Sequence, residues 1–140
     1  MGGPPGPRGH RAPLPDDARY LVGNKGFRNI IWVWDLQDFA TLTSEVVQYD
    51  PGPDYFDIAA LDYYDGGCLA SEYATMQTAA AGKLIAIGEC STLPTADELA
   101  QQPDWSFFML WPDFIGQNTG ALPALYAASN VVTLGQMPGW

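Results

Sequence analysis

Positive charge is scarce along most of this chain. Five of the six Lys and Arg residues lie within the first 28 positions, and from residue 29 onward only Lys83 is positive, against 14 carboxylates. The formal net charge is −10. A surface of that sign repels phosphate backbones and anionic lipid headgroups. We therefore expect neither nucleic acid nor a membrane surface as a partner, and a neutral ligand fits the charge best.

Cysteine and histidine are equally sparse, with two Cys and one His in 140 residues. No Cys or His pair has the spacing of a zinc site, and no glycine-rich nucleotide loop follows a predicted strand. Cys68 and Cys90 could be two thiols or one disulfide, and their spacing matches no redox motif. The sequence thus predicts no metal ion and no organic cofactor.

Long apolar runs are missing as well. None reaches the roughly 18 residues that cross a bilayer, and residues 1–15 contain no apolar core of a signal peptide. Secretion stays compatible with the sequence if the natural start lies upstream of Met1. Nine of the first 15 residues are Gly or Pro, so residues 1–17 are expected to form a disordered linker. One domain is expected over residues 18–140.

Short apolar runs alternate with helical patterns through that domain. The runs predict four strands, and helices are expected near 69–81, from Thr95, and near 121–128, with the end of an earlier helix at 18–22. The strands are expected at 30–34, 56–61, 84–87 and 107–110. Nearly continuous hydrophobic strands separated by helices indicate a parallel sheet covered by helices. Four such units are half of a (β/α)₈ TIM barrel, so the fold class predicted is α/β.

Each predicted strand delivers at least one carboxylate at its carboxyl end, and three of the four deliver an aromatic ring. The ends read Trp34-Asp35, Asp62 to Asp65, Glu89-Cys90 and Trp111-Pro112-Asp113. Functional residues of parallel α/β folds lie at these ends. Carboxylates act as nucleophile and acid/base in glycosidases, and aromatic rings stack on sugars. The aromatic content of 13%, with five Trp, agrees with a sugar ligand.

Glu89 is the predicted nucleophile because it follows a fully apolar strand and a glycine. The plainer alternative is a carboxylate that caps a helix or pairs with a cation, and cations are nearly absent. Tyr64 is expected to bond and orient Glu89, the alternative being a surface tyrosine. Asp62 could order the same network or be a structural acid. Trp111 is expected to form a sugar platform, the alternative being core packing.

Other polar and aromatic residues are assigned no function. At least one of Trp32 and Trp34 is expected to pack into the protein, and Tyr73 and Met76 to face the core. Carboxylates on helices and loops are expected to be solvated, namely Asp16, Asp17, Glu45, Glu72, Asp97 and Glu98.

Several segments together resemble glycoside hydrolase family 26, the β-mannanases. Residues 29–34 (NIIWVW) are similar to that family's fifth strand, residues 49–65 to its sixth, and residues 80–89 (AAGKLIAIGE) to its seventh. Residues 105–115 resemble its eighth strand and residues 130–138 its C-terminal tail. The resemblance covers residues 18–140 and implies the C-terminal half of the barrel, about strands 5–8.

The resemblance implies hydrolysis of internal β-1,4-mannosidic bonds with retention of configuration. Glu89 would be the nucleophile, Tyr64 and Asp62 would support it, and Trp111 would shape the sugar subsite, with no cofactor. Cys90 departs from the family, which usually has another residue type after the nucleophile. The family's acid/base Glu belongs to the fourth strand, which this chain lacks, and Asp16 and Asp17 in a linker cannot replace it. The fragment alone is therefore expected to be inactive, and its open sheet edges are expected to promote self-association.

Two other functions fit the same residues. One is a retaining (β/α)₈ glycosidase that acts on β-glucan or xylan, which product analysis would separate from a mannanase. The other is a non-catalytic carbohydrate-binding remnant, which would bind mannan without turnover.

Overall fold

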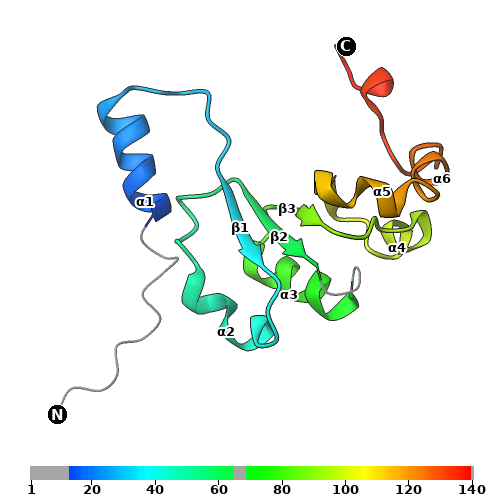
Figure 1. The fold of residues 1–140 in the computed structure, drawn as a ribbon. Coiled ribbons are helices and arrows are strands. Elements are labelled where there is room, and N and C mark those ends of the chain that lie inside the picture. Colours follow the sequence, from blue (N-terminus) through cyan, green and yellow to red (C-terminus); the bar gives the residue numbers. More distant parts are fainter. Residues whose placement is uncertain (1–12, 65–68, 140) are drawn as a thin grey trace.

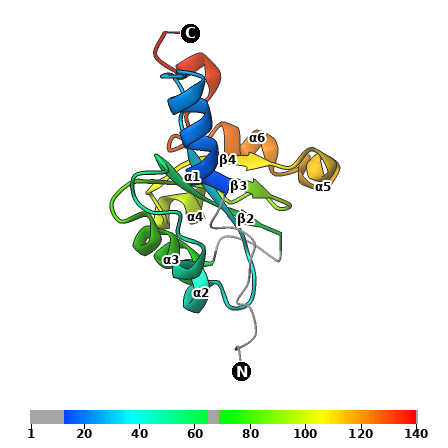
Figure 2. The ribbon, with the colours of Figure 1, turned by 90° about the vertical axis from the view of Figure 1, so that its left-hand side faces the viewer.

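The computed structural model describes residues 13–64 and 69–139. Its centre is a parallel sheet of four strands in the order β1-β2-β3-β4 (Figures 1 and 2). The strands are β1 (Val33–Gln37), β2 (Ile58–Tyr63), β3 (Leu84–Cys90) and β4 (Trp105–Leu110). Sequential parallel strands joined by helical segments confirm the predicted α/β class.

Helical segments connect and follow the strands. They are α1 (Pro13–Ala18), the π-helix η1 (Arg19–Asn24), α2 (Leu42–Tyr49), α3 (Ala70–Ala80), α4 (Ala96–Gln101), η2 (Pro112–Phe114), α5 (Ile115–Asn118), α6 (Leu122–Tyr126) and η3 (Leu134–Gln136). The predicted capping box of α4 is present, because Thr95 Oγ1 accepts from the Glu98 N–H at 3.1 Å and Glu98 Oε2 accepts from the Thr95 N–H at 2.7 Å. Helix α3 ends at Ala80, before Gly82 with its φ of +89°.

One face of the sheet is covered by these helices. Trp34, Leu61 and Ile85 of three strands pack with Leu42 of α2 and Met76 of α3 in one buried cluster. A second cluster lies under the carboxyl ends of β2 and β3 and contains Tyr63, Ile87, Cys90, Leu93, Leu125 and Val131. Side chains alternate along a strand. The residues that alternate with these face the opposite side of the sheet, where Asp35 is exposed whereas Ala60 and Ala86 are buried.

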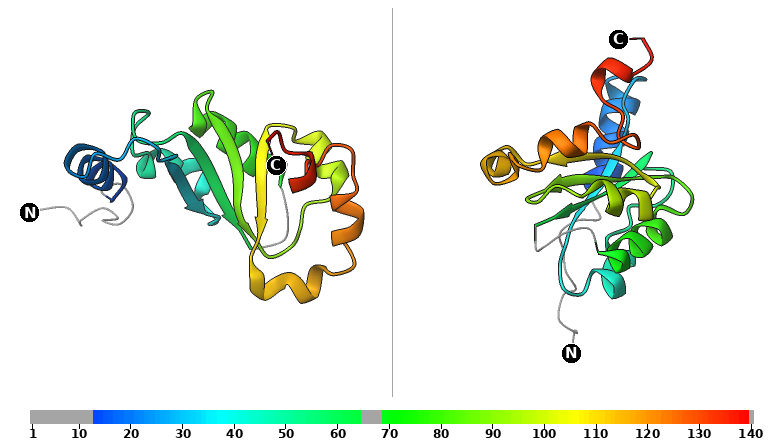
Figure 3. Two further views of the ribbon diagram at one scale, coloured as in Figure 1. Left: turned by 90° about the horizontal axis from the view of Figure 1, so that it is seen from above. Right: turned by 90° about the vertical axis from the view of Figure 1, so that its right-hand side faces the viewer.

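The N-terminal helix stands apart from this sheet in Figure 1 and in the left view of Figure 3. It begins at Pro13, which is earlier than the expected start of order near residue 17. Residues 1–12 lie outside the described residues. The chain reaches β1 through an extended stretch in which the Trp32 N–H donates to Asp57 Oδ2 at 2.8 Å. The long apolar helix needed to cross a membrane was not found among the described residues.

Elements β1, β2 and α2 differ most from the sequence-based expectation; β2 was expected at 56–61 and spans Ile58–Tyr63. Strand β1 was expected at 30–34 but spans Val33–Gln37, because its outer half alternates buried and exposed residues and does not form a continuous apolar run. Helix α2 has no helical signature in the sequence. Three of its eight residues, Thr43, Val46 and Val47, are β-branched and lower helix propensity. It forms because Leu42 and Val46 pack on the sheet.

Candidate functional site

An irregularity in strand pairing brings two predicted site residues together. Leu61 of β2 pairs with Ile87 of β3, but the next residue, Asp62, pairs with Glu89. Gly88 is thus the extra residue of a β-bulge, and such a bulge re-aims the side chain that follows it. Glu89 consequently stands beside Asp62 at the carboxyl end of the sheet, where parallel α/β folds carry their functional residues.

Tyr64 holds Glu89 directly. The Tyr64 hydroxyl donates a hydrogen bond to Glu89 Oε2. Burial first, and then this hydrogen bond and the carboxylate charge, raise the pKa of Tyr64, so the phenol keeps its proton and remains a donor. A hydrogen bond donated to a carboxylate stabilises the charged form. The predicted pairing of Tyr64 with Glu89 is therefore present as a contact.

The loops after β3 and β4 fix the position of Tyr64. The Ser91 hydroxyl donates to the Tyr64 carbonyl at 2.9 Å, and the Phe114 ring lies 5.9 Å from the Tyr64 ring, centroid to centroid. Both side chains were missed by the sequence analysis. Ser91 follows Glu89 and Cys90 directly, and that nearness to the predicted nucleophile was the one available signal for it.

A buried asparagine joins the same two loops. Asn118 of α5 is 5% exposed, and its amide donates to the Ser91 and Phe114 carbonyls, each at 2.9 Å. Its Oδ1 accepts from the Leu93 N–H at 2.9 Å. A buried amide with three satisfied bonds specifies one geometry. Asn118 therefore fixes the loop after Glu89 against the segment after β4.

Asp62 is half-buried next to Glu89. Burial, followed by the charges of Asp35 and Glu89, raises the pKa of Asp62 to about 7. The sequence left Asp62 between an ordering and a structural role; the structure places it in register with Glu89, and none of the described residues donates a hydrogen bond to its Oδ1.

Asp35 does not lie where the sequence suggested. It was expected to end the first strand, but β1 continues to Gln37, and Asp35 pairs with Ala60 inside the sheet. Its side chain lies on the opposite face of the sheet from Leu36 and interacts with Asp62. The expected strand end was too early because Leu36 is the second buried residue of an alternating strand.

Glu72 corrects another expectation, since it is not solvated. Its side chain is 8% exposed at the start of α3, and Glu72 Oε2 accepts from the Leu69 N–H at 3.3 Å. Burial first, and the charge of Asp38 second, raise the pKa of Glu72 to about 7. A helix start that faces the sheet end buries its first-turn acid, which local sequence cannot reveal.

Trp111 immediately follows β4, at the same carboxyl end of the sheet as Glu89. Its N–H donates to the Cys90 carbonyl at 2.9 Å, and the residue is 38% exposed. Trp34, in contrast, is 3% exposed in the core and contacts Phe56. Trp111 is thus anchored through its backbone and is partly accessible, as a sugar platform requires.

The Cys90 side chain is buried, and its thiol donates to the Met109 carbonyl at 3.3 Å. Cys68 lies outside the described residues. Within the described ranges, no group of three or more His, Cys, Asp or Glu side chains is placed to hold a metal ion.

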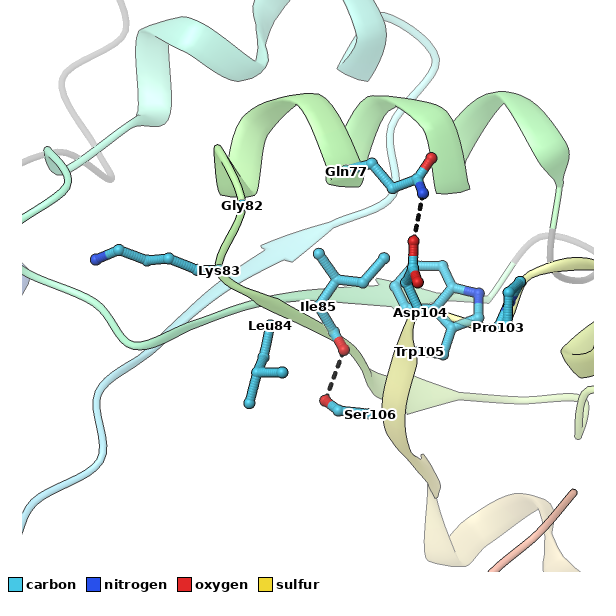
Figure 4. A pocket seen from close by; sticks show the side chains of 9 residues that line it. All are labelled: Gln77, Gly82, Lys83, Leu84, Ile85, Pro103, Asp104, Trp105 and Ser106. Carbon is cyan, nitrogen blue, oxygen red and sulfur yellow. Dashed lines mark hydrogen bonds between the residues drawn. The ribbon is translucent and has the colours of Figure 1, made fainter.

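A cavity of about 650 Å³ lies at the opposite end of β3 and β4 (Figure 4). Gln77 Nε2 donates to Asp104 Oδ2 at 2.6 Å there, and the Ser106 hydroxyl donates to the Ile85 carbonyl at 2.6 Å. Lys83, at its edge, donates to the Phe56 carbonyl. None of the predicted site residues lines this cavity, so it is separate from the carboxylate site.

Comparison with known proteins assigns the chain to a family. The model of glycosyl hydrolase family 26 matches residues 17–135. A mannan endo-1,4-beta-mannosidase of Thermothelomyces thermophilus is 30% identical over 129 residues, which cover 86% of this chain and 25% of that protein.

Solved structures agree in fold. GH26A of a Muricauda species is 28% identical with a TM-score of 0.82, and the match covers 89% of this chain and 42% of that one. The Podospora anserina GH26-CBM35 beta-(1,4)-mannanase is 26% identical with a TM-score of 0.77, covering 91% and 29%. The chain thus spans between a quarter and a half of the length of these relatives. Its four strands correspond to part of their TIM barrel, as predicted.

Proposed function

Because this chain belongs to glycosyl hydrolase family 26, we propose that it carries the nucleophile half of a retaining β-mannanase site, with Glu89 as the nucleophile. The observation that carries the proposal is the hydrogen bond from Tyr64 to Glu89 at the carboxyl end of the sheet. It supplies an oriented carboxylate on a rigid strand. The substrate would be the β-1,4-linked mannan on which the curated relative is named to act.

Retaining glycosidases work in two steps. In the first, a Glu89 oxygen attacks the anomeric carbon and the bond to the leaving sugar oxygen breaks, which gives a covalent glycosyl–enzyme. In the second, water displaces Glu89 and restores the carboxylate. Tyr64 would hold the attacking group in line, and Trp111 would support the sugar ring from the neighbouring strand end.

Protonation of the leaving oxygen needs a second carboxyl group about 5–5.5 Å from the nucleophile. Asp16 and Asp17 lie on α1, away from the rim (Figure 3), and Asp16 pairs with Arg19 at 3.2 Å. We infer that these 140 residues do not hydrolyse mannan by themselves, since general acid catalysis contributes about 10²–10⁴-fold.

Covalent labelling tests Glu89 as the nucleophile and does not require the carboxyl group that protonates the leaving oxygen. An activated 2-deoxy-2-fluoro-mannoside with a leaving group that needs no protonation should label the chain once, and intact-mass spectrometry measures the product. Glu89→Ala should abolish the label, because no attacking oxygen remains.

Asp113→Asn is the matched control, since Asp113 is an exposed carboxylate of η2, which follows the neighbouring strand β4. It should label like the unchanged chain. Labelling that persists in Glu89→Ala would refute the assignment of Glu89, and an unlabelled parent chain would show that these residues do not suffice for the first step.

A carbohydrate-binding role is the second candidate. The partly exposed Trp111 on an open rim supports it, because a ring can bind sugar without any chemistry. Binding of mannan without labelling would favour it, whereas products from lichenan or xylan would favour another glycan over mannan. For either role we propose an extracellular location, where polysaccharide is found.

A further inference from the structure

The carboxyl groups of Asp35 and Asp62 both lie close to the backbone of Gly88, the residue before Glu89. A Cβ atom added to Gly88 would lie 2.5 and 2.7 Å from the two carboxylate oxygens of Asp35 and 2.8 Å from Oδ1 of Asp62. Real Cβ atoms do not approach so closely, so glycine is the residue that leaves room for both. The three residues come from three neighbouring strands, β1, β2 and β3.

One carboxylate oxygen of Asp62 lacks a hydrogen-bond donor among the described residues. This oxygen, Oδ1, is buried. The charged groups that act on Asp62 are Asp35 from β1 and Glu89 from β3, both of the same sign, and the hydroxyl of the nearby Tyr64 donates its hydrogen bond to Glu89. Two ionised carboxylates that face the same point repel each other, whereas one proton between them makes a hydrogen bond.

We propose that Asp35 and Asp62 share one proton and that Asp35 thereby acts as a positioning residue for Glu89. The shared proton removes one of three negative charges from the rim and ties β1 to β2 next to the bulge. Asp62, held in this way, occupies the register position opposite Glu89. The effect on Glu89 rests on the proposed function, but the sharing of the proton does not.

The electrostatics of the pair agree with this arrangement. Partial desolvation, followed by the neighbouring charges, raises the pKa of Asp62 to about 7, and the pKa of Asp35 is also raised. Two carboxyl groups that share a proton release it as a pair. As the pH rises through about 7, the rim gains a negative charge beside Glu89.

Carboxyl ¹³C NMR of the 140-residue chain, labelled at Asp, tests the sharing directly. In the unchanged chain we expect two Asp carboxyl signals to shift together in a step near neutral pH. In Asp35→Asn one signal is lost, and the step of the other moves to lower pH, because the charge and the hydrogen bond of Asp35 are gone while desolvation remains. Asp62→Asn should likewise remove the coupled step.

Asp113→Asn makes the same substitution at an exposed residue of η2 and should leave both signals unchanged. If no Asp carboxyl of the folded chain titrates near neutrality, or if the Asp62 step is the same in Asp35→Asn, the shared proton is refuted. Circular dichroism checks the fold of each variant, and Asp62→Asn provides the test if Asp35→Asn does not fold.

The consequence for positioning has its own readout. The rate of fluoro-mannoside labelling in the unchanged chain should fall as the pH rises past about 7, when the pair loses its proton. In Asp35→Asn that fall should be absent or shifted. A pH profile identical in both proteins would refute the positioning role. Absence of labelling in every variant would count against the proposed function and leave the NMR result standing.

Discussion

At the scale of single residues, the hydroxyl of Tyr64 is the clearest determinant of the candidate site. It is one oxygen atom, yet it fixes the orientation of Glu89 and is itself held by Ser91 and Phe114. Its raised pKa keeps it protonated, and so a donor, at neutral pH. A residue of this kind should affect the reactivity of Glu89 more than the stability of the protein.

Tyr64→Phe is therefore expected to slow fluoro-mannoside labelling by roughly 10- to 100-fold, since a hydrogen bond to a charged group contributes about 1.5–3 kcal/mol. The rate of mass increase under saturating reagent measures this. Tyr126→Phe, which removes an exposed hydroxyl on α6, is the control and should label at the parent rate. Equal rates in the two variants would contradict an orienting role for Tyr64.

At the scale of secondary structure elements, the first turn of α3 contains a buried carboxyl group, that of Glu72, whose charged form is disfavoured. Glu72 is buried against Asp38, which follows β1, and this raises the pKa of Glu72 to about 7. The folded chain therefore binds a proton that the unfolded chain has already lost above about pH 4.5. This contribution to stability is complete below that pH and is lost as the pH rises to about 7.

Glu72→Gln should remove that loss, because the amide carries no charge and can still accept from the Leu69 N–H. Its free energy of unfolding should exceed that of the parent chain at about pH 8 by up to about 3 kcal/mol, since each pKa unit between 4.5 and about 7 corresponds to about 1.4 kcal/mol. The difference should shrink toward about pH 5. Urea unfolding at several pH values measures both.

Asp97→Asn serves as the comparison, since it removes an exposed acid from the first turn of α4. Its difference from the parent chain should not grow with pH in this way. A Glu72→Gln variant whose stability follows the parent curve at every pH would show that the buried carboxyl carries no unfavourable charge.

At the scale of the whole molecule, the sheet is open. Among the described strands, β1 pairs only with β2 and β4 only with β3, so each has an unpaired outer edge. On β4, Phe107 and Met109 are 42% and 44% exposed, and Trp111 continues the row. Unpaired edges beside exposed apolar side chains favour association with another chain.

We expect the 140-residue chain to self-associate as its concentration rises, and sedimentation velocity over a concentration series measures this. Met109→Lys should weaken the association, because a charge on an edge strand opposes pairing. Val47→Lys makes a comparable change on α2, where Val47 is 68% exposed, and should not. A parent chain that remains monomeric throughout, or two variants that behave alike, would contradict the role of the β4 edge.

Much of this architecture follows from local sequence. The runs at 84–87 and 107–110 lie within β3 and β4, and the Thr95–Glu98 capping box begins α4 where predicted, because apolar period and cap chemistry act between residues close in the chain. The family also follows from ordered motifs. Glu89, Tyr64 and Trp111 could be named because each stands at or just after the end of an apolar strand.

Other features required the tertiary structure, because they depend on residues that approach from separate strands or helices. The bulge at Gly88 depends on the register between β2 and β3, and no single strand encodes a register. The meeting of Asp35 with Asp62 and the burial of Glu72 depend on which face of each element is covered. The sequence by itself determined which groups end the strands, whereas only packing decided which carboxylates would lie close enough to compete for a proton.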